Sequence, residues 1–329
     1  MKIYLNYGIL FFVFSSFLFL ISCQQGDQTT VLKLAHGLDP SHSVHQGMVY
    51  MAEKVEEKSG GKMRIDIYPS GQLGSERENV EMLQIGSLAI TKVSAAVMEG
   101  FAPSYKIFSL PYMFISREHS QRVMDGDIGH EILTDGQEFY LRGLTFYDAG
   151  SRSFYTKDKP IKHPDDLGGM KIRVMSSPTA VNMVRTLGGS PTPISWGELY
   201  TALQGGVVDG AENNPPSFYL SHHYEVCKYY SLNEHATIPD VLLISTKIWD
   251  NLTEQEQVWL QEAADESAVH QRQLWIESEE HSLEMAKEGG VEISYPDKEP
   301  FIEAVQPIYE DLKKDTKLWS VIERIRELQ

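Results

Sequence analysis

The sequence predicts an α/β protein of two lobes joined by one long helix, and three observations support this prediction. Residues 31–93 alternate strand and helix patterns in the order β-α-β-α-β, which is typical of an open, largely parallel sheet. A similar alternation begins after residue 144. Residues 254–288 contain neither Gly nor Pro and begin at a capping box, so they predict a helix long enough to cross both lobes.

The first half of the chain shows clear strand and helix patterns. Apolar residues alternate with polar ones at 63–67, and this period of two indicates a strand. Val44, Met48 and Val55 recur at helical spacing, and Gly60 follows them as a stop. The predicted elements are a strand at 31–35, a helix ending before Gly60, a strand at 63–67, a helix at 75–86 and a strand at 88–93.

The second half predicts a strand at 171–175, helices at 178–187 and 196–205, and a segment at 207–209 that leads to a strand end. A helix over 254–288 would be about 52 Å long at about 1.5 Å per residue. Because helices usually have about 11–12 residues, the alternative is two helices with an unmarked break near 266–268.

Composition and charge limit the class of protein to which this chain can belong. The 329 residues include 29 Lys and Arg against 46 Asp and Glu, which gives a net charge of −17. This excess of negative charge argues against nucleic acid and anionic membrane surfaces as partners. A chain of this length needs no disulfide or metal for a stable core. Of the two cysteines, Cys23 and Cys227, the second is expected to be a buried, inert thiol.

The first 23 residues are typical of an export signal. An apolar run with Lys2 as its only charge ends at Leu20-Ile21-Ser22-Cys23, which resembles a bacterial lipobox. We therefore expect a lipoprotein signal peptide at 1–22, lipidation of Cys23 and a polar tether at 23–30. The alternative is a plain signal peptide with an incidental cysteine. In both cases the function lies outside the cytoplasm, where ATP-driven and nicotinamide chemistry are not expected.

Motifs of catalysis are missing from the sequence. It contains no G-x-S-x-G elbow, no phosphate-binding loop, no dinucleotide fingerprint and no H-E-x-x-H. The eleven histidines are scattered, and His42 with His45 provides only two of the three or four ligands that a metal needs. We therefore expect no catalytic residue, no metal and no cofactor. An enzyme on sugar acids would have to use Lys92 or His42 as its base, without a paired partner.

Six segments together carry a resemblance to a known family. They are 67–78, 83–88, 150–156, 166–174, 187–204 and 206–216, and their order and spacing resemble those of the solute-binding proteins of TRAP transporters, the DctP family. Each motif alone is only moderately specific, but the resemblance extends over about residues 31–325. The family implies a periplasmic protein that binds a small organic acid and delivers it to a small and a large membrane subunit driven by an ion gradient.

The resemblance also implies a fold and a place for the ligand. It implies two α/β lobes, joined by crossing strands and a long helix, that close on a ligand in the cleft between them. We place lobe I at 31–150 plus about 239–275, and lobe II at 151–238 plus about 276–329. The membrane is contacted only through the lipid anchor and the partner subunits.

Four site residues match the family's motifs directly. Arg173 matches the arginine that clamps a carboxylate, a task for which a planar guanidinium is well suited. Arg152 matches a second basic contact, and Asn213 matches an amide that bonds the ligand, although Asn214 could be the one that faces inward. Trp196 matches an aromatic residue over the ligand. The plainer alternatives are a surface arginine, a salt bridge at the cleft rim, a turn-forming asparagine and a core tryptophan.

Four further candidates come from their positions. Glu76 follows a turn at the tip of the predicted sheet, and Lys92 ends a strand, where ligands of α/β sheets bind. His36 follows the first strand, and His42 begins the next helix. We expect Glu76, Lys92 and His42 to bond hydroxyl groups. Glu76 could instead be a first-turn helix charge, and Lys92 could be solvated.

The combination favours a sugar acid over a dicarboxylate. Glu76 would repel a second carboxylate of the ligand. A ligand with one carboxylate and several hydroxyl groups suits both Arg173 and the pair of Glu76 and Lys92. The stretches around His36, His45 and Lys92 look similar to those of family members that bind hexuronates. We therefore expect glucuronate, galacturonate or a related aldonate. The alternatives are a C4-dicarboxylate or other organic acid, an ABC importer instead of a TRAP transporter, and a sensing role.

Overall fold

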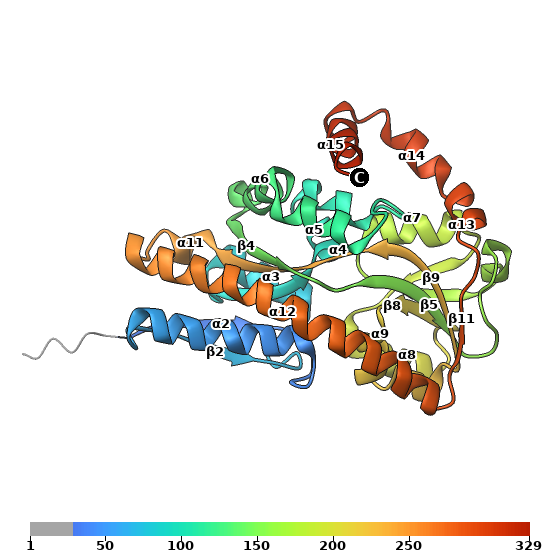
Figure 1. Ribbon diagram of the computed structural model, residues 1–329, viewed down its shortest axis with the longest axis horizontal. Helices are drawn as coiled ribbons and strands as arrows, with labels where there is room; N and C mark the ends of the chain where they lie inside the picture. Colours follow the sequence, from blue (N-terminus) through green and yellow to red (C-terminus); the bar gives the residue numbers. More distant parts are fainter. Residues whose placement is uncertain (1–28) are drawn as a thin grey trace, which may run out of the picture.

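The computed structural model describes residues 29–329 (Figure 1). The expected signal peptide at 1–22, Cys23 and the tether up to residue 28 lie outside the described residues. Two mixed sheets, each with its own helices, are connected by α12 (Glu254–Glu288). No helix within 29–329 is long and apolar enough to cross a membrane.

The first sheet has the strand order β2-β1-β3-β10-β4. Its strands are β1 (Thr30–Ala35), β2 (Met63–Tyr68), β3 (Ile90–Ser94), β4 (Leu141–Tyr147) and β10 (Asp240–Ser245). The first three are mutually parallel, and β10 enters between β3 and β4 as an antiparallel strand. Helices α2 (Ser43–Ser59) and α3 (Glu76–Ile85) connect the parallel strands, as the sequence predicts.

The capping chemistry of these helices explains their ends. Gly60 ends α2 with φ +61°, a left-handed conformation that glycine adopts without strain. Ser75 and Glu78 form the capping box that begins α3. On α2 the apolar positions expected to face inward, Val44, Met48 and Val55, are fully buried.

The second sheet has the order β11-β9-β5-β8-β6-β7. Its strands are β5 (Ser151–Thr156), β6 (Lys171–Val174), β7 (Ser190–Pro193), β8 (Gly210–Asn213), β9 (Tyr229–Thr237) and β11 (Glu292–Ser294). The sequence patterns did not predict β7, whose Pro191 and Pro193 are accommodated because this strand lies at the sheet edge. The helices of this lobe are α7 (Pro178–Thr186), α8 (Trp196–Gln204), α9 (Pro215–Leu220) and α10 (His223–Val226).

Two chain crossings and α12 join the lobes. The chain passes from β4 to β5 through residues 148–150 and returns from β9 to β10 through 238–239. The helix α12 is continuous over the range that the sequence predicts, with the Thr253–Glu256 capping box in place, so the alternative of a break near 266–268 is wrong. Its Gln271 holds the first crossing, since the side-chain amide donates to the Asp148 carbonyl at 2.8 Å and accepts from the Asp148 N–H at 2.9 Å.

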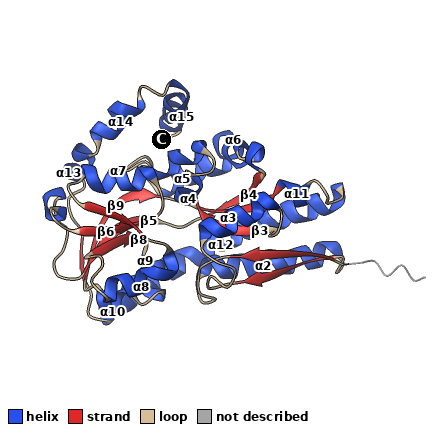
Figure 2. Ribbon diagram, turned by 180° about the vertical axis from the view of Figure 1, so that it is seen from behind, coloured by secondary structure: helices blue, strands red, loops and turns tan. Residues whose placement is uncertain are grey.

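The C-terminal helices return to the first lobe (Figure 2). After α13 (Glu299–Ala304) and α14 (Gln306–Leu312), the last helix α15 (Thr316–Glu327) lies beside α5 (Arg117–Asp125) and α6 (Asp127–Asp135). His119 of α5 bonds the Ile325 carbonyl at 2.9 Å, and Arg324 pairs with Glu131 of α6 at 2.7 Å. The expected placement of residues 276–329 in lobe II is therefore corrected for α15, whose apolar face packs on lobe I.

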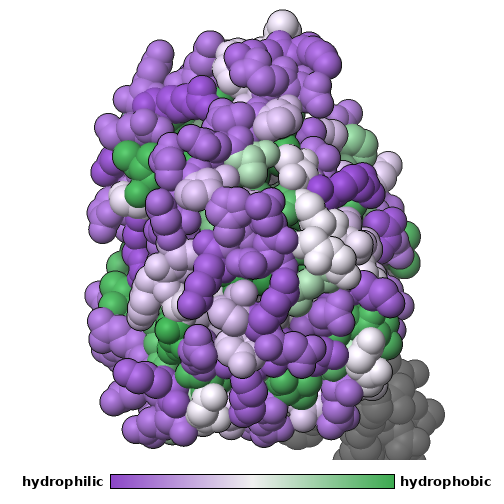
Figure 3. Space-filling view, turned by 90° about the vertical axis from the view of Figure 1, so that its right-hand side faces the viewer, coloured by the Kyte–Doolittle hydropathy of each residue, from purple (hydrophilic) through white to green (hydrophobic). Residues whose placement is uncertain are grey.

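The remaining helical segments of the first lobe are α4 (Ala95–Met98), the 3-10 helices η1 (Pro103–Ser109) and η2 (Gln137–Phe139), and α11 (Thr246–Trp249). In the second lobe η3 (Pro164–Leu167) precedes β6. One buried apolar cluster runs from η1 and α5 of the first lobe to α7 and α14. The surface in Figure 3 is mostly hydrophilic, in keeping with the charged composition.

Candidate functional site

A cavity of about 450 Å³ lies between the lobes. Its first-lobe lining includes Glu76, Lys92 and Asp240, and its second-lobe lining includes Arg152, Arg173, Trp196, Asn213 and Asn214. Six of the eight site residues expected from the sequence therefore meet in one place. The size is that of a site for a small molecule.

Arg173 presents a buried positive charge without a counter-ion. It lies on β6 and is only 2% exposed, which excludes the alternative of a surface arginine. Its Nε donates to the Ile194 carbonyl at 2.8 Å, and its Nη1 has no hydrogen-bond partner. Within residues 29–329 no carboxylate pairs with it, and burial lowers its pKa. A buried guanidinium in this state is a favourable partner for a ligand carboxylate.

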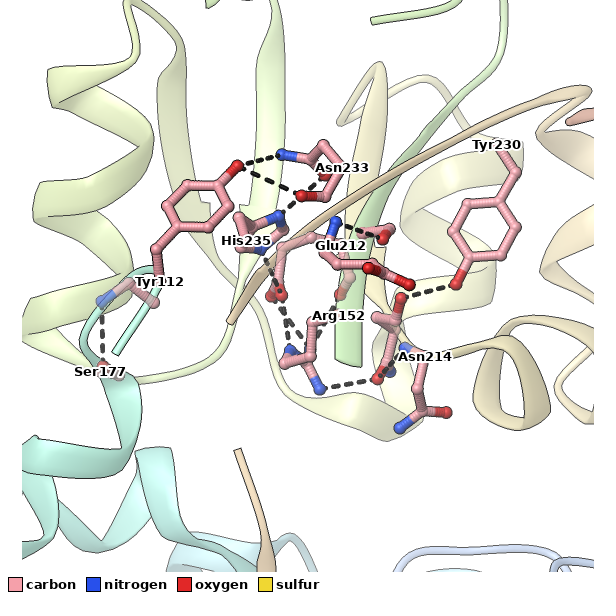
Figure 4. A network of polar contacts seen from close by, with 12 residues as sticks. Tyr112, Arg152, Ser177, Glu212, Asn214, Tyr230, Asn233 and His235 are labelled. Atoms are coloured by element: carbon pink, nitrogen blue, oxygen red, sulfur yellow. Dashed lines mark hydrogen bonds and ion pairs between the residues drawn. The ribbon is translucent and has the colours of Figure 1, made fainter. Parts of the chain in front are cut away.

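Arg152 is also buried, but its charge is compensated (Figure 4). Its Nε donates to Glu212 Oε2 at 2.6 Å, and its Nη2 donates to Glu212 Oε1 at 3.0 Å and to the Glu212 carbonyl at 2.8 Å. The Nη1 donates to Asn213 Oδ1 at 2.6 Å, which leaves its second N–H without a partner among the described residues. Arg152 does form a salt bridge, as the alternative has it, but both partners are buried and do not lie at an exposed rim.

Asn213 and Asn214 have different tasks although both line the cavity. Asn214 caps α9, since its Oδ1 accepts from the Ser217 N–H at 2.8 Å. Asn213 Oδ1 accepts from Arg152 and from the Asn214 N–H. The Asn213 Nδ2 makes no hydrogen bond to a described residue, so Asn213 presents a fixed donor next to Arg152.

Lys92, Glu76 and Asp240 form a buried charge triad at the other side of the cavity. Lys92 Nζ lies 2.8 Å from Glu76 Oε1 and 3.2 Å from Asp240 Oδ1. Burial lowers the pKa of Lys92, but the two carboxylates outweigh burial and raise it, so the amine is charged. Burial also raises the pKa of Asp240, against the effect of Lys92. The two carboxylates of the triad accept hydrogen bonds and the Lys92 ammonium donates them, so the triad can bond several hydroxyl groups of a ligand.

The sequence patterns did not reveal Asp240 or the role of Glu212. Asp240 reaches Lys92 because β10 pairs with β3 in antiparallel register, with Leu242 opposite Lys92, so that Asp240 falls two residues along on the same face. Glu212 faces Arg152 because β8 pairs with β5. Both pairings join segments distant in the chain, and no local pattern predicts them.

Trp196 forms part of the cavity wall at the start of α8. Its ring centroid lies 6.0 Å from the Arg173 guanidinium carbon and 5.2 Å from the His223 ring centroid. The indole is partly buried and packs against apolar clusters of both lobes. It is therefore both a core residue and a flat apolar face beside the clamp arginine.

His36 and His42 do not line the cavity. His36 Nε2 lies 3.0 Å from His45 Nδ1, and its Nδ1 accepts from the Leu38 N–H. His42 caps α2 through its Nδ1. Burial lowers the pKa of His36 to about 2 and that of His42 to about 3, so both rings are neutral at pH 7. The structure therefore places these two histidines behind the wall, apart from the other six candidates.

Residues 29–329 provide neither a cluster of metal ligands nor a reactive cysteine. No group of three or more His, Cys, Asp or Glu side chains there is arranged to hold a metal ion. Cys227 is a free, buried thiol whose pKa burial raises to about 12, which makes it a poor nucleophile. The cavity remains the principal site, and its chemistry is recognition of an anion that carries hydroxyl groups.

Comparison with known proteins identifies the family. Residues 34–315 match the DctP family, described as bacterial extracellular solute-binding protein, family 7. A solute-binding protein of Chromohalobacter salexigens is 35% identical over 292 residues, which is 88% of this chain and 87% of that protein.

Solved structures agree with this family. A TRAP periplasmic solute-binding protein from Xanthobacter autotrophicus, with bound β-D-galacturonate, is 40% identical with a TM-score of 0.88, covering 91% of this chain and 100% of that one. One from Anaerococcus prevotii, with bound D-glucuronate, is 40% identical with a TM-score of 0.89, covering 91% and 98%. The chain therefore belongs to the family 7 extracellular solute-binding proteins, the DctP family of TRAP transporters.

Proposed function

We propose that this protein captures a hexuronate, such as glucuronate or galacturonate, in the cavity between its lobes. The observation that carries the proposal is the buried Arg173 guanidinium, which has no counter-ion and lies across the cavity from an acidic, hydroxyl-binding triad. Similar proteins of this family contain galacturonate or glucuronate. Members of the family bind solutes outside the cytoplasm for TRAP membrane subunits and are not enzymes.

The two sides of the cavity suit the two parts of a hexuronate. Its carboxylate would accept from Arg173, from the free N–H of Arg152 and from Asn213 Nδ2. Its hydroxyls would bond Glu76, Lys92 and Asp240, which together carry one positive and two negative charges. The sugar's C–H groups would lie on the Trp196 ring.

Thermal unfolding of residues 24–329 with a panel of acids tests this function. A ligand at about 100 times its Kd adds about 2.7 kcal/mol to the free energy of unfolding, which is readily measured. We expect glucuronate or galacturonate to raise the Tm most among hexuronates, aldonates, C4-dicarboxylates, 2-oxo acids and sialic acid. A shift with C4-dicarboxylates alone would keep the family and overturn the hexuronate assignment and the role of the triad.

The charge of the triad predicts rejection of a second carboxylate. A hexarate, which carries a carboxylate at both ends, is expected to bind at least about tenfold more weakly than the matching hexuronate, because Glu76 and Asp240 repel the second carboxylate. Asp240→Asn removes one negative charge and should narrow the ratio of the two Kd values, as measured by calorimetry. An unchanged ratio would contradict this account. Glu53→Gln, which removes an exposed negative charge on α2 outside the cavity lining, is the control.

We also propose that Cys23 anchors the mature protein to a membrane through a lipid. The support is the lipobox-like end of the apolar segment at residues 20–23. Cys23→Ser is expected to move the protein from the membrane fraction to the soluble periplasmic fraction of expressing cells. If the wild type and Cys23→Ser are distributed equally between the membrane and soluble fractions, a plain signal peptide is the correct interpretation.

A further inference from the structure

Glu99 connects the two lobes through three hydrogen bonds. It directly follows α4 of the first lobe, and its carboxylate reaches the start of α7 in the second lobe. Oε2 accepts from Ser177 Oγ at 2.6 Å and from the Thr179 N–H at 3.3 Å, and Oε1 accepts from Thr179 Oγ1 at 2.6 Å. Both carboxylate oxygens are therefore held by the opposite lobe.

These bonds lie at the edge of the ligand cavity. Val97, two residues before Glu99, lines the cavity from the first lobe, and Ser176, next to Ser177, lines it from the second. Glu99, Ser177 and Thr179 are not themselves part of the lining. The contact therefore spans the gap between the lobes just outside the space available to the ligand, and it does not belong to the recognition groups.

The three hydrogen bonds of Glu99 are strong because their acceptor is charged and lies at the start of a helix. Ser177 is the N-cap of α7, a helix of nine residues, and the carboxylate of Glu99 lies at the positive end of that helix. Hydrogen bonds to a charged acceptor are about twice as strong as neutral ones. Glu99 is only partly buried, so its carboxylate can be hydrated again when the lobes separate.

We propose that Glu99 is a latch that holds the lobes closed over the bound ligand. β6, which carries Arg173, continues through Ser176 into α7, so the clamp and the Glu99 partners belong to one continuous segment of the second lobe. Movement of α7 away from α4 must break all three bonds before the ligand can leave. The latch thus sets the residence time of the ligand. This inference rests on the proposed function only because hexuronates serve as the probe.

Dissociation rates of galacturonate and glucuronate test the latch. They are followed by the fluorescence of the tryptophans, of which Trp196 lines the cavity. In Glu99→Gln and in Thr179→Val we expect koff to rise about tenfold, because the ligand leaves only after these bonds have broken. The double variant should rise no further than the single ones, since both remove the same contact. Glu53→Gln, on the exposed face of α2, is the control.

An unchanged koff in Glu99→Gln and Thr179→Val, while the wild type binds its acid normally, would overturn the latch. A lower Tm of the ligand-free variants in that case would make the contact a static part of the fold.

A measurement without ligand keeps this test separate from the proposed function. Small-angle scattering of the ligand-free Glu99→Ala protein should give a larger radius of gyration than that of the wild type. Equal radii would overturn the latch even if no hexuronate bound. Failure of hexuronates to bind, with a larger radius in the variant, would overturn only the proposed ligand.

Discussion

Replacing Arg173 by methionine is expected to abolish hexuronate binding while leaving the ligand-free protein at least as stable as the wild type. The guanidinium is buried and has no counter-ion among the described residues, so its charge costs free energy until a carboxylate arrives. Loss of one partner of a buried charge pair weakens binding by about 2–5 kcal/mol, which is about 30-fold to several thousandfold in Kd. Calorimetry and ligand-free thermal unfolding measure the two effects.

The matched control for this variant is Arg185→Met, on the exposed side of α7. It should leave both the Kd and the Tm within error of the wild type. Arg173→Lys should also bind weakly, because an ammonium cannot both donate to the Ile194 carbonyl and form two parallel bonds to a carboxylate. Hexuronate affinity that survives in Arg173→Met would refute the clamp.

Replacing Glu212 by glutamine is expected to destabilise the protein strongly at neutral pH. Glu212 and Arg152 form a buried pair, and removing one partner leaves the other charge uncompensated, at a cost of about 3–5 kcal/mol. His235 Nε2, 3.5 Å from Glu212 Oε2, also loses its acidic neighbour. Chemical denaturation at pH 7 measures the loss.

The same pair predicts a pH dependence with a defined sign. Burial raises the pKa of Glu212, but Arg152 and His235 outweigh it and lower the pKa from 4.5 to about 2. A carboxyl with a lowered native pKa stabilises the fold above its unfolded value, and this contribution is lost as the pH falls from about 4.5 toward 2. The stability difference between wild type and Glu212→Gln should therefore shrink below pH 4.5. A difference that stays constant down to pH 3 would contradict the prediction.

Local chemistry allowed much of the fold to be predicted. The Thr253–Glu256 capping box and the lack of Gly and Pro define α12 at both ends. Gly60 and the Ser75 capping box define the first two helices in the same way. The long-range pairs could not be predicted by these means. Asp240 reaches Lys92 only through a strand that returns after 146 residues, from Ser94 to Asp240, and sequence patterns carry no signal for such a partner.

The site shows the same division between local and distant information. Arg173, Arg152, Asn213 and Trp196 were found through motifs, and all four line the cavity. We expect His36 at the ligand because it follows a strand. That position locates a residue at the edge of the sheet but does not determine where its side chain points. It points to His45 instead of the cavity.

The helix α15 illustrates a further limit of sequence patterns. An amphipathic helix shows that it has one apolar face but does not show which lobe will cover that face. Ile325 is fully buried, and its carbonyl bonds His119 of α5. Assignment of the C-terminal residues to a lobe therefore depends on contacts more than 200 residues apart in the chain.

The position of β10 between β3 and β4 has a consequence for the order of folding. The first sheet needs residues 240–245 at its interior, and these are synthesised only after every strand of the second sheet except β11. The first lobe therefore cannot complete its hydrogen-bonded sheet on a growing chain until three quarters of the residues have been made. Contacts of such long sequence separation form slowly. The N-terminal half of the chain alone therefore cannot form a finished domain.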